Sequence, residues 1–231
     1  MGSLSPSQQQ RRAKNGTIDI VEDDLPLAEG LALLLDSQAY MVRHFDSGER
    51  FLERFLADSH DPRQAQPGCI LLDIRLSKQS GLMVFDKIIG AGRKYMKPVI
   101  FMTGHGDMDI AVDVLTRGAF DFVTKPFVSE TLISKIDSAV DKSQALLENL
   151  CARELLQDRI DRLTQKEVLV MQGIAAGKSN REIAEETGNS IRTIELHRSH
   201  VLQKLGVQNA VELASVLARA NLIDTPRTLP L

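Results

Sequence analysis

Five side chains suited to metal-assisted phosphoryl transfer each follow a short apolar run in this 231-residue sequence: Glu22, Asp23, Asp73, Thr103 and Lys125. A carboxylate oxygen can attack phosphorus as a covalent nucleophile. Three carboxylates without a nearby His or Cys form an oxygen cluster of the kind that suits Mg²⁺. An ammonium group and a hydroxyl can meet the charge that develops on the transferred oxygens. These residue types therefore predict a Mg²⁺-dependent phosphoryl-transfer site.

The apolar runs before these residues predict the strands that would bring them together. Their unbroken Ile, Val and Leu character is typical of parallel strands covered on both faces, and the segments between them have helical periodicity. This alternation predicts an α/β doubly wound five-stranded parallel sheet, in which the carboxyl ends of the strands meet at one edge. The predicted strands are Thr17–Val21, Tyr40–Phe45, Cys69–Leu72, Val99–Met102 and Phe120–Val123.

A long helix is predicted over 129–162, because this stretch contains neither Pro nor Gly. We interpret 141–163 as a helical linker after the α/β domain. An apolar stripe runs along this linker, and it is open to two interpretations, a rigid spacer or a short coiled-coil seam. The stripe consists of Leu146, Leu150, Leu155 or Leu156, and Ile160.

A second, all-α four-helix domain is predicted over 164–225. Gly177, Gly188 and Gly206 fall at helix ends, as C-terminal glycine caps do. The second and third helices are joined by a tight turn, which is the helix-turn-helix plan, and Ser190 is a natural N-cap for the third. The predicted helices are Thr164–Ala176, Asn180–Thr187, Ile191–Leu205 and Ala210–Ala220.

Composition limits the class of protein. A hydrophobic content of 43% with 26% charged residues is ordinary for a globular protein, and no apolar run is long enough to span a membrane. Residues 1–15 are expected to form a disordered tail, since no apolar segment follows their basic residues as in a signal peptide. The only cysteines, Cys69 and Cys151, favour a reducing compartment over a disulfide framework. We therefore expect a cytoplasmic protein.

Four motifs resemble the signatures of the response-regulator receiver domain over 16–140: IVEDD, LLDIRLSKQSG, FMTGHGD and GAFDFVTKPF. The resemblance implies that Asp73 is the phosphoacceptor and that Thr103 and Lys125 contact the phosphoryl group. It also implies Mg²⁺ ligands and a conformational switch. The implied ligands are Glu22, Asp23, Asp73 and the backbone carbonyl of Arg75, and the switch residues are Thr103 and Phe122.

The sequence departs from the usual receiver pattern at two positions. Ser77 stands where the family usually has Pro, which would loosen the loop after Asp73 without removing chemistry. Phe122 lacks the hydroxyl of the Tyr often found there, so the switch would have to work by packing. We interpret Asp24, the third acidic residue of its run, first as a helix cap.

The alternative enzyme class is the haloacid-dehalogenase phosphatases, which also combine an Asp nucleophile, a Thr, a Lys and Mg²⁺ on a similar sheet. That class needs a second Asp two residues after the nucleophile, where this chain has Arg75. Its nucleophile follows the first strand, whereas Asp73 follows the third. These differences favour a regulator that is not an enzyme.

Residues 163–218 resemble the LuxR/FixJ (NarL) type of DNA-binding output domain. A rotation of 100° per residue predicts that Ile194, Val201 and Leu205 form the buried face of the third helix. We expect a partly buried, hydrogen-bonding His197 and a snorkelling or ion-pairing Arg198. The predicted DNA contacts are Lys178, Asn180, Arg192, Thr193, Glu195, Leu196, Ser199, His200, Gln203 and Lys204, of which Lys178, Asn180, Thr193 and Lys204 would touch phosphates.

The DNA-binding prediction depends on this resemblance more than on charge. The net charge is −3 and the exposed face is only modestly basic, so a helical protein–protein module is the alternative.

Together the resemblances imply a two-component transcriptional regulator. Its expected partners are a sensor histidine kinase, promoter DNA and a second copy of itself, in a homodimer that phosphorylation promotes. RNA polymerase is a further candidate partner, and no membrane is involved. A receiver that serves as a phosphorylation-independent dimerisation module is the alternative, against which the complete acidic pocket argues.

Overall fold

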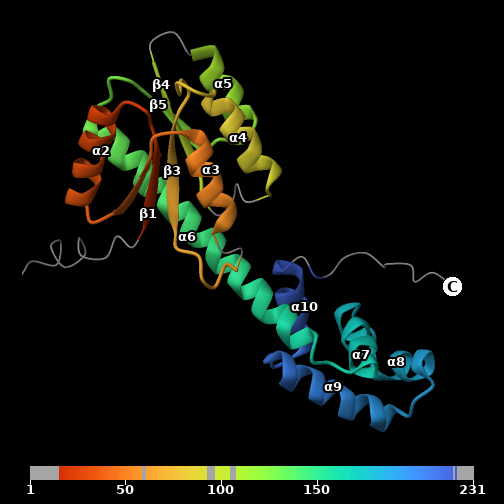
Figure 1. Ribbon diagram of the computed structural model, residues 1–231. Coiled ribbons are helices and arrows are strands. Elements are labelled where there is room, and N and C mark those ends of the chain that lie inside the picture. The colour runs from red at the N-terminus through yellow and green to blue at the C-terminus, as the bar shows by residue number, and fades with distance from the viewer. Residues whose placement is uncertain (1–15, 59–60, 93–96, 105–107, 221, 223–231) are drawn as a thin grey trace, which may run out of the picture. The chain divides into compact units, whose positions relative to one another are not determined.

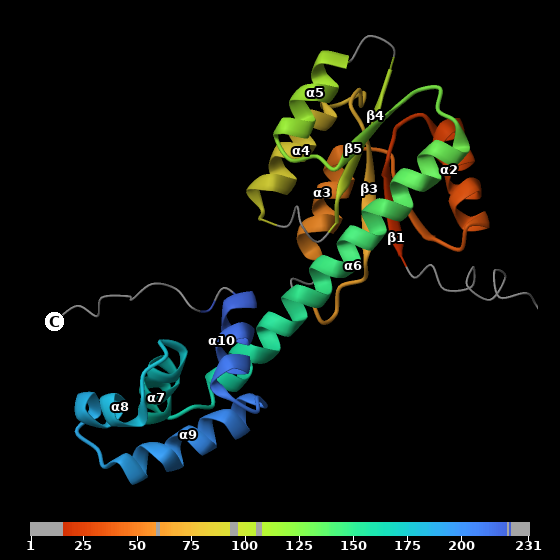
Figure 2. The ribbon, with the colours of Figure 1, turned by 180° about the vertical axis from the view of Figure 1, so that it is seen from behind.

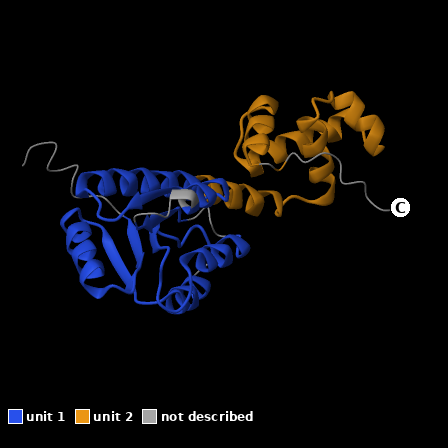
Figure 3. Ribbon diagram, turned by 90° about the horizontal axis from the view of Figure 1, so that it is seen from above, with its two compact units in different colours: residues 1–148 blue, residues 149–231 orange. Residues whose placement is uncertain are grey.

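A computed structural model describes residues 16–58, 61–92, 97–104, 108–220 and 222. The predicted tail 1–15 and the residues after 222 lie outside this description. The chain divides into two compact units after Glu148 (Figure 3). Within the described part of the chain, no helix combines the length and apolar character that crossing a membrane requires. The division falls inside the predicted linker.

The first unit contains the predicted five-stranded parallel sheet, in the order β2-β1-β3-β4-β5. The change of direction in this order, where β1 meets β3, is the switch point at which such sheets place their ligands. Each predicted strand is present, with bounds shifted by at most one residue at each end. The strands are β1 (Thr17–Val21), β2 (Met41–Phe45), β3 (Gly68–Asp73), β4 (Val99–Thr103) and β5 (Asp121–Thr124).

Helices cover both faces of this sheet (Figures 1 and 2). An aromatic-rich core fills one face, with Phe51, Phe85 and Phe101 at its centre, and an aliphatic core fills the other, with Leu31, Leu35 and Ile136. This double coverage explains why the strands are continuously apolar. The helices are α2 (Leu25–Ser37), α3 (Gly48–Ala57), α4 (Gly81–Gly90), α5 (Met108–Thr116) and α6 (Ser129–Ile160).

Helix α6 contributes to the cores of both units, so the predicted linker 141–163 is not a free spacer. Ser143 is fully buried and its hydroxyl accepts a hydrogen bond from the Gly68 N–H at 3.1 Å. Leu147 is buried as well, whereas Leu155 of the predicted stripe is half exposed. Leu156 packs in the core of the second unit instead. The alternating burial favours neither a plain spacer nor a continuous seam.

The second unit is the predicted all-α domain. Four helices pack around Ile174, Ile183, Ile194 and Leu213. Gly188 and Gly206 end α8 and α9 in the left-handed backbone conformation, which agrees with their predicted role as glycine caps. The helices are α7 (Gln165–Ala175), α8 (Asn180–Thr187), α9 (Ile191–Leu205) and α10 (Ala210–Arg219).

Candidate phosphorylation site and DNA-binding face

The predicted carboxylates meet at the carboxyl edge of the sheet. Glu22 and Asp23 follow β1 directly, and Asp73 is the last residue of β3, the neighbouring strand. One carboxylate oxygen from each lies within 4.8 Å of the others. This convergence confirms the expectation drawn from the strand ends, and it creates a concentration of negative charge that a hard cation would relieve.

Lys125 lies between two of these carboxylates. Its Nζ is 2.6 Å from Glu22 Oε2 and 3.2 Å from Asp73 Oδ2. The Lys125–Pro126 peptide bond is cis. Lys125 therefore reaches the predicted phosphoacceptor directly, which is the position that contact with a phosphoryl oxygen requires.

Burial shapes the electrostatics of this site. Glu22 is almost completely buried, and the loss of hydration raises the pKa of its carboxyl group. The charge of Asp73 raises this pKa further, while Lys125 opposes both effects. The residues present fit a Mg²⁺ ion, because the donor set is all oxygen and the buried carboxylates repel one another.

The loop after Asp73 folds back tightly on the end of β3. The N–H of Gly81 donates to the carbonyl of Ile74 at 2.9 Å, and Ser80 caps α4 through the N–H of Leu82. A Cβ on Gly81 would lie 2.0 Å from the carbonyl oxygen of Asp73, so only glycine fits there. The start of α4 therefore lies against the backbone of the predicted phosphoacceptor. Arg75 lies in this loop, and the role of its carbonyl as a metal ligand stays a prediction.

The two predicted switch residues have well-defined partners. Thr103 is buried, and its hydroxyl donates to the carbonyl of Val123 at 3.2 Å. Phe122 is partly buried against the aromatic-rich core, and the ammonium group of Lys135 lies 5.8 Å from its ring centroid. Asp24 caps α2 by accepting from the N–H of Leu27, as predicted.

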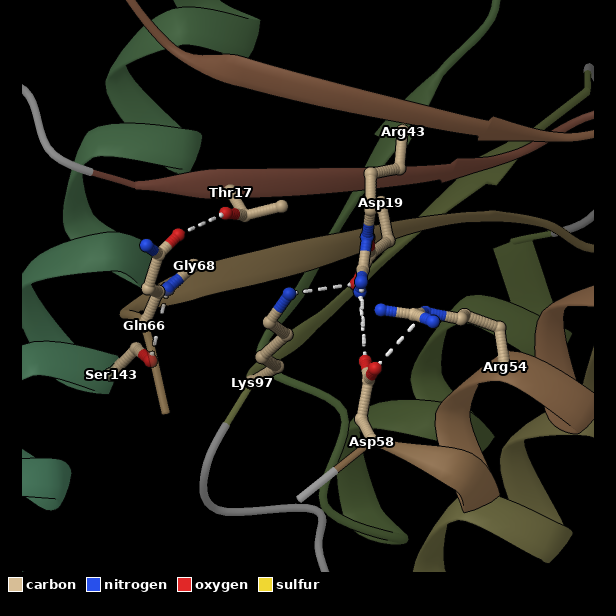
Figure 4. A network of polar contacts seen from close by, with 9 residues as sticks. All are labelled: Thr17, Asp19, Arg43, Arg54, Asp58, Gln66, Gly68, Lys97 and Ser143. Carbon is tan, nitrogen blue, oxygen red and sulfur yellow. Dashed lines mark hydrogen bonds and ion pairs between the residues drawn. The ribbon is translucent and has the colours of Figure 1, made fainter. Parts of the chain in front are cut away.

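A buried ionic network was not predicted from the sequence (Figure 4). Asp19, in the middle of β1, is fully buried. Arg43 of β2 donates to it through Nε at 2.6 Å and Nη2 at 3.0 Å, and Lys97 Nζ lies 2.8 Å away. Arg43 also bonds Asp58 at the end of α3. The hydrogen bonds to Asp19 are the main cause of the raised pKa of Arg43. The network links β1 to β2 and to the end of α3.

The third helix of the second unit, α9, presents two faces as predicted. Ile194, Val201 and Leu205 are buried, and Ser190 caps the helix through the N–H of Thr193. Thr193, a predicted phosphate contact, is partly exposed, and the predicted base-reading positions are all exposed. These are Arg192, Glu195, Leu196, Ser199, His200 and Gln203.

Several predicted contacts around α9 have partners within the domain. Lys178 pairs with Glu186 at 2.6 Å, and Lys204 pairs with the buried Glu167 at 2.7 Å. Asn180 Oδ1 accepts a hydrogen bond from Nη1 of Arg198 at 3.3 Å, so among the described residues Arg198 bonds a neutral amide and not an acid. Lys178, Asn180 and Lys204 as phosphate contacts therefore stay predictions.

His197 agrees with its expected role in its burial. The residue is partly buried, as predicted, but its buried Nδ1 has no hydrogen-bond partner within the described part of the chain. The expected hydrogen bond is therefore not made by this nitrogen, and for the residue as a whole it stays a prediction.

Glu167 should make the second unit sensitive to acid. Its carboxylate accepts hydrogen bonds from Lys204 and from the backbone and hydroxyl of Thr164, and these lower its pKa from 4.5 to about 2. A carboxyl group whose pKa is depressed by folding stabilises the fold above its ordinary pKa, and this stabilisation is lost as the pH falls toward the depressed value.

We therefore expect Glu167→Gln to destabilise the second unit by about 1–2 kcal/mol at neutral pH and to lose less stability on acidification than the wild type. Hydrogen exchange of the α7 and α9 amides between about pH 5 and about pH 3 measures this difference. Glu185→Gln, in an exposed pair with Arg181, is the control and should behave as the wild type. Equal acid sensitivity in wild type and Glu167→Gln would contradict the prediction.

Comparison with known proteins agrees with both halves of this geometry. Residues 18–137 match the family model of the response regulator receiver domain, and residues 161–217 match that of the bacterial regulatory proteins of the luxR family. The chain belongs to the two-component response regulators. This response regulator joins a receiver domain to a LuxR-type DNA-binding domain, a combination that implies regulation of transcription.

Relatives of the response regulator share its whole organisation. It is 36% identical over 199 residues to the C4-dicarboxylate transport transcriptional regulatory protein DctR of Rhodobacter capsulatus, covering 86% of this chain and 97% of DctR. The low-resolution structure of the response regulator StyR superposes with a TM-score of 0.74 at 29% identity, covering 89% and 99% of the two chains. Full-length FixJ from B. japonicum gives 0.53 at 31% identity, covering 92% and 100%.

Proposed function

We propose that this protein is a cytoplasmic, phosphorylation-dependent transcriptional regulator. A sensor histidine kinase would transfer a phosphoryl group to Asp73 in the presence of Mg²⁺, and the phosphorylated protein would bind promoter DNA as a dimer. The observation that carries the proposal is the meeting of the Glu22 and Asp23 carboxylates and of Lys125 around Asp73. RNA polymerase is a candidate partner at the promoter.

The transfer step follows from the positions of the side chains. An oxygen of Asp73 attacks phosphorus, the bond to the kinase imidazole breaks, and an acyl phosphate forms on Asp73. Glu22, Asp23, Asp73 and the Arg75 carbonyl would hold Mg²⁺, which would neutralise charge on the transferred oxygens. Lys125, already 3.2 Å from Asp73, supplies a second positive charge to the phosphoryl group.

The signal would then pass through Thr103 and Phe122. The Thr103 hydroxyl, which donates to Val123 in this structure, would turn to a phosphoryl oxygen. Phe122, packed by its ring alone, would repack against the core. These new contacts shift the balance between two conformations only if one conformation gains more from them than the other.

We propose that the exposed face of α9 contacts the DNA bases. We expect Arg192→Ala and Gln203→Ala each to weaken binding to a cognate promoter by about 1–3 kcal/mol, because each would lose hydrogen bonds to base edges in the major groove. Fluorescence anisotropy at fixed salt measures the affinity. Arg153→Ala removes the same charge from an exposed position of α6 and should bind as the wild type. Unchanged affinity in both α9 variants would refute this assignment of the face.

The proposal as a whole is tested by footprinting genomic DNA with and without a small acyl-phosphate donor, alongside sedimentation of the protein. We expect the donor to promote both dimers and protected sites. Protection and dimerisation that are the same with and without the donor would instead support a receiver that serves as a phosphorylation-independent dimerisation module.

A further inference from the structure

The last turn of α6 contacts the carboxyl end of α9, the helix that carries the proposed DNA-reading face. Nη1 of Arg159 donates a hydrogen bond to the carbonyl oxygen of Leu205 at 2.7 Å, across 46 residues of sequence. Leu205 is the last residue of α9. The final carbonyls of a helix have no partner within it and carry the negative end of the helix dipole, so a cation is favourable there. Arg159 therefore closes the end of α9 from a different helix.

Gly206 leaves room for this contact. It follows α9 with a φ of +72°, in the left-handed region that favours glycine, and a Cβ built on it would lie 2.6 Å from Nη1 of Arg159. The N–H of Gly206 turns back to the carbonyls of Leu202 and Gln203. It therefore does not compete with the guanidinium for the carbonyl of Leu205.

The contact differs in origin from the ion pair that holds the same end of α9 within the domain. Lys204 of α9 pairs with Glu167 of α7 at 2.7 Å. Arg159 comes from α6 and precedes residues 161–217, which match the family model of the luxR-type regulators. The match to that family therefore assigns Arg159 no role.

The carboxyl end of α9 determines where one predicted base-reading side chain lies. Gln203 is exposed and stands two residues before Leu205, so a displacement of this helix end moves its amide group. Hydrogen bonds to base edges weaken steeply when the donor and acceptor leave their preferred distance and angle. Contacts to phosphates carry no sequence information, so a displaced helix end costs preference for one sequence and not general affinity for DNA.

We propose that Arg159 is a positioning residue for DNA recognition, which holds the carboxyl end of α9 in the orientation that its exposed face needs to contact bases. The inference rests on the proposed function, since it concerns the same face of α9. It makes the last turn of α6 a part of the DNA-binding apparatus, without any contact between Arg159 and the DNA.

Two substitutions separate the guanidinium from the rest of the side chain. Arg159→Met keeps an apolar stem but no donor, and Arg159→Lys keeps a positive charge that can donate. We expect Arg159→Met to bind the duplex protected in the genomic footprint about 5-fold or more weakly, which corresponds to the loss of one base contact. Its affinity for a scrambled duplex of the same length should change by less than about 2-fold. Arg159→Lys should keep most of the preference.

Fluorescence anisotropy over a range of salt concentrations measures both affinities on the full chain treated with the acyl-phosphate donor, and circular dichroism confirms that the variants are folded. Arg153→Met removes the same charge from another exposed position of α6 and should bind both duplexes as the wild type does.

Three results would overturn the inference. Equal losses on both duplexes, with a salt dependence reduced by about one phosphate contact, would show that Arg159 touches the DNA backbone instead. Unchanged preference in Arg159→Met would leave it a purely structural residue. The same loss of preference in Arg159→Lys or in Arg153→Met would show that the hydrogen bond to α9 is not the cause.

A measurement on the wild type serves if Arg159→Met does not fold. In nuclear magnetic resonance spectra, the Nη1 hydrogens of Arg159 should exchange slowly with water, with and without the footprint duplex, because the carbonyl of Leu205 holds them. Rapid exchange in the bound protein would overturn the inference. A wild-type chain that binds both duplexes equally would refute the DNA-reading function and with it this inference. A normal wild-type preference together with any failure above would refute the role of Arg159 alone.

Discussion

Asp73→Asn is expected to abolish acyl-phosphate labelling. The amide has nearly the shape of the carboxylate but lacks the nucleophilic oxygen, so Lys125 and the other carboxylates would surround an inert side chain. Incubation with a small acyl-phosphate donor and Mg²⁺, followed by intact mass measurement, should show one phosphoryl group on the wild type and none on the variant. The response of DNA binding to the donor should disappear as well.

Asp46→Asn is the matched control for this experiment. Asp46 follows β2 at the same edge of the sheet, but it is exposed and pairs with Arg50. It should therefore keep full labelling. Labelling that persists in Asp73→Asn would refute the assignment of the phosphoacceptor, and labelling lost in both variants would show that the two substitutions act through the fold.

Asp19→Ala should cause the largest loss of stability. Removing one partner of a buried ion pair commonly costs about 3–5 kcal/mol, because it leaves buried charge unpaired. Arg43 and Lys97 keep some access to water, and Arg43 keeps Asp58, so we expect the lower end of that range, about 3 kcal/mol. Urea unfolding followed by circular dichroism measures the change in free energy.

Asp58→Ala separates burial from charge in the same network. Asp58 also pairs with Arg43, but about a third of its side chain is exposed. Its removal should cost about 1 kcal/mol or less, since partly solvated pairs contribute little. A loss of stability in Asp19→Ala no greater than in Asp58→Ala would contradict the importance of the buried pair.

The sheet and the acidic site could be predicted because both follow from short-range patterns. Apolar runs of four to six residues mark the strands, and parallel topology then brings Glu22, Asp23 and Asp73 to one edge whatever their separation in sequence. No contact between individual side chains is needed for that conclusion.

The Asp19 network could not be predicted in this way. A single acidic residue in the run TIDIV is compatible with an edge strand, a turn or a buried pair, and its partners stand 24 and 78 residues further along. The same limit applies to Lys204, whose type suggests a phosphate contact although Glu167 lies beside it in the fold. Pairing of this kind is a property of packing, not of local pattern.

The shared use of α6 by both cores decides where this protein can be cut for study. A receiver fragment that stops at residue 140 would lack Ser143 and leave the Gly68 N–H without its buried acceptor. A DNA-binding fragment that begins at residue 164 would lack Leu156 and also Arg159, which donates to the carbonyl of Leu205 at 2.7 Å. Fragments that meet between Glu148 and Asn149 would each keep their own part of the helix.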